Sequence, residues 1–199
     1  MQSRLPTEER QAEIVAAALM LAREVSPALI TTSDLAAAVG VTQGAVFKHF
    51  PTKDAIWLAA MCWVSEQLMS ALATAAGKAG SPLEALGAMF KAHIGFVTTH
   101  PGVPRLIFHE LQRPADSPIK QEVRSLLKSY RKLLRTLLDA AVAAGEVSAQ
   151  VDLEAAATLF VGVVQGLVMQ SMTTGNAAAM KAQADPVFAI YRRGISKVL

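Results

Sequence analysis

Residues 31–53 read TTSDLAAAVGVTQGAVFKHFPTK, and this segment predicts two short helices joined by a tight turn. Thr31 and Asp34 form a capping-box pair that begins the first helix, because each side chain can satisfy a backbone donor that the helix leaves unpaired. Gly40 is expected to end it, since glycine adopts the left-handed conformation at little cost. Thr42 is the natural cap of the second helix. The segment therefore predicts a helix-turn-helix.

The second helix of this unit is expected to enter the major groove of DNA with its N-terminal end. Small residues at Gly44 and Ala45 would let the backbone approach the bases. Gln43 can both donate to and accept from an adenine edge. Basic side chains lie where phosphates would run, namely Lys48, His49 and Lys53.

At these residues the chain resembles the tetracycline-repressor (TetR) family of bacterial transcriptional regulators. The matching pieces are residues 30–36, 40–50 and 53–54, about a quarter of the chain. The family commonly has a tyrosine where this chain has Phe47, which lacks the phosphate-binding hydroxyl and is assigned to packing or to a thymine methyl. The resemblance adds Thr31 to the phosphate contacts. The predicted DNA-binding residues are Thr31, Thr42, Gln43, Gly44, Ala45, Phe47, Lys48, His49 and Lys53.

Composition predicts an all-α protein whose DNA binding depends on local placement of charge. The chain has 199 residues, of which 52% are hydrophobic and 18% charged, and no stretch shows sustained strand-like alternation. Its net charge of +3 does not by itself indicate DNA binding, because residues 1–56, which contain the helix-turn-helix, carry five basic and six acidic side chains. One lightly charged unit would bind weakly, so two copies on adjacent half-sites are expected.

The predicted architecture has about nine helices in two domains. Residues 1–53 are expected to form a three-helix DNA-binding domain, with a first helix that starts at Thr7 and ends before Ser26 and Pro27. Residues 54–199 are expected to form a helical effector-binding and dimerisation domain. The helices expected after the helix-turn-helix span about 52–77, 81–99, 101–112, 117–144, 152–172 and 187–198.

The helix at 81–99 carries Met, Phe and His at helical spacing, which leaves two interpretations open. The side chains could be core with satisfied histidines, or they could line a cavity, where Met and Phe form an adaptable wall and His adds polar contacts. No metal or cofactor is predicted, because no carboxylate or cysteine stands at ligand spacing from His93, His100 or His109. The residues predicted to bind a ligand are Met61, Val64, Met89, His93, Phe96, His100, Phe108, Gln112 and Tyr130.

The helix at 152–172 has features of a subunit interface. Gly162 and Gly166 lie one turn apart and give a smooth strip that another helix backbone can approach closely. In the resembled family, the last two helices pair with their symmetry mates in a four-helix interface, while the helices between form the effector pocket. The predicted homodimer interface comprises Phe160, Gly162, Gly166, Val187 and Tyr191.

The predicted function is that of a homodimeric repressor, released from a near-palindromic operator by a small apolar ligand. The alternative is a DNA-binding adaptor whose C-terminal domain binds a protein partner and no small-molecule effector. An enzyme is not expected, because the sequence shows no nucleophile–base pair, glycine-rich phosphate loop or metal-ligand cluster.

A cytoplasmic location without a membrane span is also predicted. The single Cys62 suits a reducing compartment, and the N-terminus has no secretory signal pattern. The most apolar run, residues 155–169, is interrupted by Gln165 and is shorter than the roughly 20 residues of a spanning helix.

Overall fold

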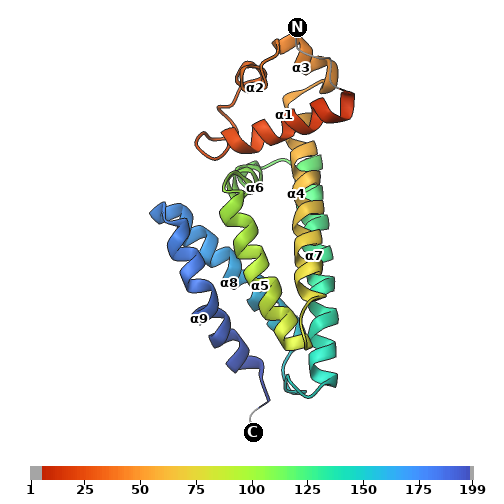
Figure 1. Cartoon of the computed structure of the whole chain (residues 1–199), viewed down its shortest axis with the longest axis vertical. Coiled ribbons are helices and arrows are strands. Elements are labelled where there is room, and N and C mark those ends of the chain that lie inside the picture. The colour runs from red at the N-terminus through yellow and green to blue at the C-terminus, as the bar shows by residue number, and fades with distance from the viewer. Residues whose placement is uncertain (1–5, 198–199) are drawn as a thin grey trace. The chain divides into compact units, whose positions relative to one another are not determined.

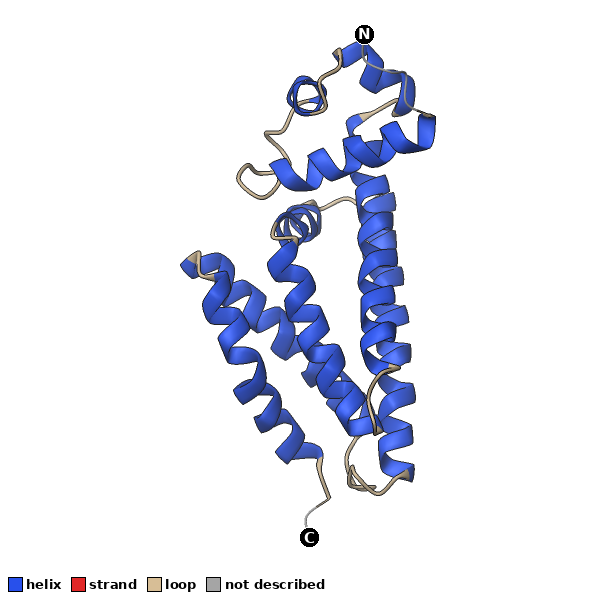
Figure 2. Cartoon of the chain, viewed as in Figure 1, coloured by secondary structure: helices blue, strands red, loops and turns tan. Residues whose placement is uncertain are grey.

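The computed structural model describes residues 6–197, and these residues form nine α-helices and no β-strand (Figures 1 and 2). An isolated antiparallel bridge joins Val147 and Ser196. The prediction of an all-α fold with about nine helices is confirmed. The helices are α1 (Thr7–Leu21), α2 (Thr32–Ala38), α3 (Gln43–His49), α4 (Lys53–Ala76), α5 (Pro82–Thr99), α6 (Gly102–Gln112), α7 (Pro118–Ala143), α8 (Leu153–Thr174) and α9 (Ala177–Ile195).

The chain divides into two compact units, each made of two segments. Unit 1 comprises Met1–Glu66 and His100–Arg124, and unit 2 comprises Gln67–Thr99 and Ser125–Leu199. Helices α4 and α7 contribute residues to both units. The functional division into residues 1–53 and 54–199 stays a prediction.

The helix-turn-helix in unit 1 forms from the local signals in its sequence. The backbone N–H of Thr31 donates to Asp34 Oδ2 at 2.8 Å, and the Asp34 N–H donates to Thr31 Oγ1 at 3.1 Å, which completes the capping box. Gly40 has a φ of 67° and ends α2 in the left-handed region. Thr42 Oγ1 accepts from the N–H of Ala45 at 3.3 Å and caps α3. Helix α1 packs against both α2 and α3.

Helix α6 is fixed within unit 1 at both of its ends. A Cβ at Gly102 would lie 2.1 Å from the Leu19 carbonyl oxygen of α1, so only glycine fits where α6 begins. Glu110 lies near the other end of α6 and is 1% exposed. Of the charged side chains that the structure describes, it is the one that is buried. Its carboxylate accepts from Arg113 Nη1 at 3.1 Å and from the Ser117 hydroxyl. This buried carboxylate therefore joins α6 to the loop before α7.

Replacing Glu110 with alanine is expected to lower the free energy of unfolding by about 2 kcal/mol, because two charge-assisted hydrogen bonds are lost and the Ser117 hydroxyl loses its acceptor. Urea denaturation followed by circular dichroism would measure the change. Glu66→Ala, at an exposed position of α4, is the control and is expected to change stability by less than about 0.5 kcal/mol. Equal urea midpoints for the two variants would contradict this role.

The core of unit 2 is an aromatic cluster contributed by α5, α8 and α9. The Phe90 ring lies 5.5 Å from both Phe160 and Phe188, measured between centroids. Tyr191 packs edge-on to Phe160 at 5.5 Å, and its hydroxyl donates to the Ala156 carbonyl at 3.1 Å. These contacts hold α5 against the last two helices of the chain.

Two sequence predictions about helix ends were wrong. Helix α1 ends at Leu21, before the predicted stop at Ser26 and Pro27, so Val25 lies in the following turn with 38% of its surface exposed. Helix α9 begins at Ala177 and not at Val187, because Asn176 Oδ1 accepts from the N–H of Ala179 at 2.9 Å and caps it ten residues earlier. Pro186 lies inside α9, where it forgoes one backbone hydrogen bond. The predicted end at Val198 lies outside the described residues.

Candidate nucleic-acid interface

Helix α3 buries one face and presents the other to solvent. Val46 is fully buried and anchors the helix in unit 1. On the opposite face, Gln43, Gly44 and Lys48 are exposed, and 45% of the Phe47 surface is accessible. Of the other predicted contacts on this helix, Ala45 and His49 are half-buried. The exposed face has the composition expected of a helix that reads bases and contacts phosphates.

Gly44 has no structural role within the protein that would require glycine. A Cβ placed at this position meets no heavy atom within 4 Å. Glycine inside a helix costs about 0.5–1 kcal/mol relative to alanine. Its presence on the exposed face of α3 is therefore consistent with a partner that must approach the backbone closely.

Besides Thr42, which caps α3, three of the predicted DNA-binding side chains already bond within unit 1. Gln43 Nε2 donates to Thr32 Oγ1 at 2.6 Å, a partner that sequence reasoning missed. Lys53 Nζ donates to the Ala28 carbonyl at 3.0 Å, and partial burial lowers the pKa of its ammonium group. The Thr31 hydroxyl is used in the α2 cap. Contact of these three side chains with DNA stays a prediction, and Gln43 would have to leave Thr32 to reach a base.

The C-terminal end of α3 is held by α1. Gln11 Nε2 donates to the His49 carbonyl oxygen at 3.1 Å. Within the described residues, the buried His49 Nδ1 has no hydrogen-bond partner. The position of α3 therefore depends on α1 as well as on the turn at Gly40.

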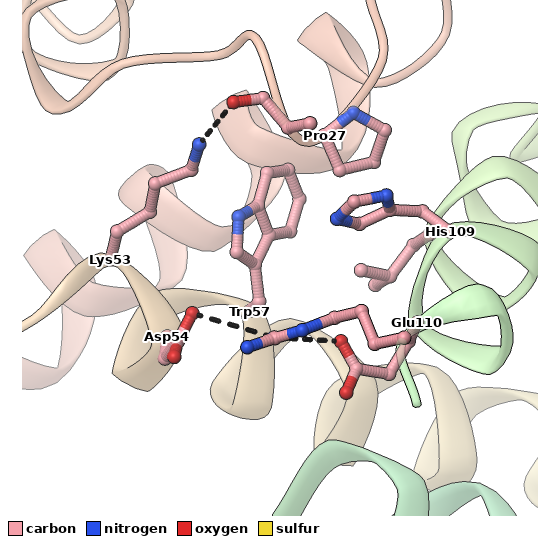
Figure 3. Close-up of a pocket in the computed structure, with 9 residues that line it drawn as sticks. Pro27, Lys53, Asp54, Trp57, His109 and Glu110 are labelled. Carbon is pink, nitrogen blue, oxygen red and sulfur yellow. Dashed lines mark hydrogen bonds and ion pairs between the residues drawn. The ribbon is translucent and has the colours of Figure 1, made fainter. Parts of the chain in front are cut away.

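Unit 1 also contains a cavity of about 170 Å³ that none of the predicted ligand-binding residues lines (Figure 3). The Trp57 indole forms one wall, and Arg113 Nη1 lies 3.1 Å from Glu110 Oε2 and 3.9 Å from Asp54 Oδ1. Its charged groups thus largely neutralise one another. Sequence reasoning missed this cavity because three separate segments form its wall. The lining residues are Pro27, Ala28, Lys53, Asp54, Trp57, Leu106, His109, Glu110 and Arg113.

The predicted ligand-binding residues in unit 1 differ in their exposure. Met61 and Val64 are fully buried, and Phe108 is half-buried. The His100 ring packs edge-on to Trp63, with 5.3 Å between centroids. Gln112 is exposed in the last turn of α6, and its contact with a ligand stays a prediction.

In unit 2, the structure pairs two of the predicted ligand-binding residues. His93 Nδ1 lies 3.0 Å from the Tyr130 hydroxyl oxygen, although the residues are 37 positions apart in sequence. Met89 and Phe96 flank His93 on α5 and are both buried. Burial lowers the pKa of His93 to about 4, and burial also raises the pKa of the Tyr130 hydroxyl. The pair is therefore uncharged at neutral pH.

This uncharged histidine predicts a pH dependence of stability. The pKa of His93 rises from about 4 to its ordinary 6.5 on unfolding, so the unfolded chain binds more protons below pH 6.5. Stability is complete above pH 6.5 and falls as the pH drops towards 4, by about 2–3 kcal/mol at pH 4.5. Urea denaturation at pH 7.5 and 4.5 should show that His93→Gln removes this part of the loss. A loss of the same size in the variant would contradict the assignment.

Two of the predicted interface residues proved to be core. Phe160 is 1% exposed and Tyr191 is 4% exposed, because both belong to the aromatic cluster of unit 2. Gly162 is exposed, while Gly166 and Val187 are half-buried. The large apolar side chains that α8 and α9 leave exposed are instead Leu159, Met169, Met172 and Ile190.

Helices α4 and α8 are long and apolar enough to cross a membrane, by length and composition alone. Core helices of soluble proteins pass the same test, so this is weak evidence for a span. Within residues 6–197, no three His, Cys, Asp or Glu side chains gather as metal ligands would.

A capped α2, a turn at Gly40 and an anchored α3 with an exposed face define a helix-turn-helix DNA-binding protein. The profile described as bacterial regulatory proteins of the tetR family matches residues 14–60, and that of a tetracyclin repressor-like C-terminal domain matches residues 112–185. The chain belongs to the TetR family of transcriptional regulators. Family and fold are those of regulators, which are not enzymes.

Known proteins resemble this chain over most of its length. A TetR transcriptional regulator from Chloroflexus aurantiacus has a TM-score of 0.82 at 22% identity and covers 97% of this chain and 98% of its own. FadR from Bacillus subtilis, solved in complex with stearoyl-CoA, has a TM-score of 0.81 at 18% identity over 92% and 98%. The nucleoid occlusion factor SlmA from Vibrio vulnificus (strain YJ016) is 24% identical over 132 residues, 66% of this chain and 67% of SlmA.

Proposed function

We propose that the protein is a homodimeric transcriptional repressor that a small, largely apolar ligand releases from a near-palindromic operator. The observation that carries the DNA-binding part is the exposed face of α3, where Gly44 leaves the backbone open. The buried Val46 and the capping threonine Thr42 hold this helix in place. The N-terminal end of α3 would enter the major groove, with Lys48 on a phosphate.

The exposed apolar side chains of α8 and α9 support a homodimer. Leu159 and Ile190 expose 54% and 63% of their surfaces, and Gly162 leaves room for a close helix approach. Two copies joined at these helices would place two α3 helices on one operator. For recognition, the two helices must stand roughly 34–36 Å apart, in successive major grooves.

The side chains around His93 in unit 2 support the proposal that the ligand is largely apolar. Met89 and Phe96 on α5 are buried apolar side chains on either side of His93, and the uncharged His93 imidazole, bonded to the Tyr130 hydroxyl, is a polar group among them. The related FadR was solved with stearoyl-CoA, whose acyl chain is long and apolar. Such a ligand would release the operator if it bound more tightly to a dimer whose α3 helices stand at another spacing.

The second candidate is a DNA-binding adaptor whose body binds another protein and takes no small effector. Similarity to SlmA favours the adaptor, because SlmA is named as a nucleoid occlusion factor and not as a ligand-regulated repressor. In this case, no ligand would change DNA binding.

The decisive experiment is footprinting of the purified protein on the DNA that flanks its own gene, with and without a panel of apolar ligands. A protected near-palindrome that one ligand abolishes would support the repressor. Protection that no ligand disturbs would favour the adaptor. Lys48→Ala and Gln43→Ala are expected to weaken protection, and full binding by both variants would rule out α3 as the recognition helix.

A further inference from the structure

We propose that the effector is an uncharged molecule that offers a carbonyl oxygen to the Nε2–H of His93, which makes His93 a specificity-determining residue. This inference rests on the proposed function, because it names the chemical class of the ligand that releases the operator. It depends on the hydrogen bonds of one side-chain pair in unit 2, His93 and Tyr130.

The hydrogen bond to Tyr130 determines which ring nitrogen of His93 carries the proton. The Tyr130 side chain is 2% exposed, and within residues 6–197 its hydroxyl has one hydrogen-bond partner, His93 Nδ1 at 3.0 Å. A buried hydroxyl proton needs an acceptor, so the phenol donates and Nδ1 accepts. A neutral imidazole that accepts at Nδ1 carries its proton on Nε2. Tyr130 therefore holds His93 as a hydrogen-bond donor at Nε2.

The Nε2–H of His93 needs an acceptor of its own. Among the described residues, His93 has no further hydrogen bond. Two buried side-chain polar atoms of the described residues have no hydrogen-bond partner, namely His49 Nδ1 and Ser65 Oγ, and His93 Nε2 is not one of them. His93 as a whole is half-buried, and an unpaired Nε2 that is not among those buried atoms is not fully enclosed by the protein. This donor is therefore available to an incoming acceptor.

The surroundings of His93 favour an uncharged ligand. Burial lowers the pKa of His93 to about 4, so the imidazole stays neutral between pH 6 and 8 and offers no positive charge to an anion. Its neighbours on α5, Met89 and Phe96, are buried apolar side chains. A carboxylate would lose its hydration here without a counter-charge, whereas a carbonyl oxygen needs only the one donor. A ketone, ester or thioester satisfies this requirement.

The test compares ligands that share a ten-carbon chain and differ in one group. Binding of 2-decanone, decane, decanoate and decylamine to the full-length protein would be measured by equilibrium dialysis at pH 7.5. We expect 2-decanone to bind about five- to tenfold more tightly than decane, which is the effect of one neutral hydrogen bond. Decanoate and decylamine are expected to bind more weakly than the ketone.

Variants assign the preference to His93. His93→Phe is expected to bind 2-decanone and decane with equal affinity, whereas His93→Gln keeps an N–H donor and is expected to restore part of the preference. His109→Phe is the matched control, since His109 is also half-buried but lies in unit 1, and it should keep the full preference. Thermal melts would show which variants are folded.

Several outcomes would overturn the inference. They are failure of 2-decanone to bind, equal affinity for ketone and decane in the wild type, tighter binding of decanoate, or an unchanged preference in His93→Phe. Operator footprinting with the same compounds tests the proposed function separately. A His93-dependent ketone preference with an undisturbed footprint would refute release by that ligand but keep the site. Operator release by the compounds without a ketone preference would keep the function and refute the inference.

Discussion

Gly44→Leu is expected to weaken operator binding by at least about 100-fold without unfolding the protein. A Cβ at this exposed position meets no protein heavy atom within 4 Å, so leucine is expected to fit the folded chain and to improve helix propensity. It would, however, stand between the α3 backbone and the bases. Breaking the hydrogen bonds to one base costs about 1–3 kcal/mol, and the substitution acts in both half-sites of the dimer.

Two variants separate this effect from a change in the fold. Gly44→Ala adds only a methyl group, and we expect a smaller loss of affinity together with a slightly higher melting temperature. Ala143→Leu introduces the same bulk at an exposed position of α7 and should leave operator affinity unchanged. Fluorescence anisotropy with the footprinted operator would give the three affinities. Wild-type affinity in Gly44→Leu would show that α3 does not approach the bases closely.

Sequence alone predicted those parts of the fold that depend on neighbouring residues. The Thr31 and Asp34 capping box, the turn at Gly40 and the Thr42 cap need only interactions over a few positions. The helix ends at Gly145 and Asp152 follow in the same way, since one takes a positive φ and the other caps the first turn of α8. These caps and turns form through local interactions, so they do not depend on how distant segments of the chain pack.

Sequence reasoning failed where distant segments decide the outcome. Periodicity put Phe160 and Tyr191 on apolar faces of their helices, but it could not show that Phe90 and Phe188 of the same chain cover those faces. The start of α9 was missed because Pro186 seemed to be a helix boundary, although it lies on the exposed side of a longer helix.

The candidate sites show the same limit. His93 was predicted from its stripe on α5, yet its hydrogen-bond partner is Tyr130, which comes from another helix. Gln43 was selected from its place at the start of α3, but its bond to Thr32 on the preceding helix was not visible from spacing. Residue types were therefore predictable, whereas their partners required the folded chain.

The exposed apolar side chains of α8 and α9 predict that Ile190→Asp will prevent dimerisation. Ile190 has 63% of its surface exposed on α9, so the substitution costs the isolated protomer little. In a dimer the same carboxylate would be buried against apolar side chains without a partner, which costs several kcal/mol. Sedimentation velocity should show a dimer for the wild type and a monomer for the variant.

Loss of the dimer should also abolish tight operator binding. A monomer presents one α3 to one half-site and loses the effective concentration that joins the second, so operator affinity is expected to fall by about 100-fold or more. Leu111→Asp is the matched control, because Leu111 on α6 is an apolar side chain 53% exposed in unit 1, and it should remain dimeric. If Ile190→Asp stayed a dimer with wild-type affinity, the subunits would have to meet through another surface. If it became a monomer yet bound the operator as tightly as before, the requirement for paired recognition helices would be wrong, since one copy of α3 would then supply the full affinity.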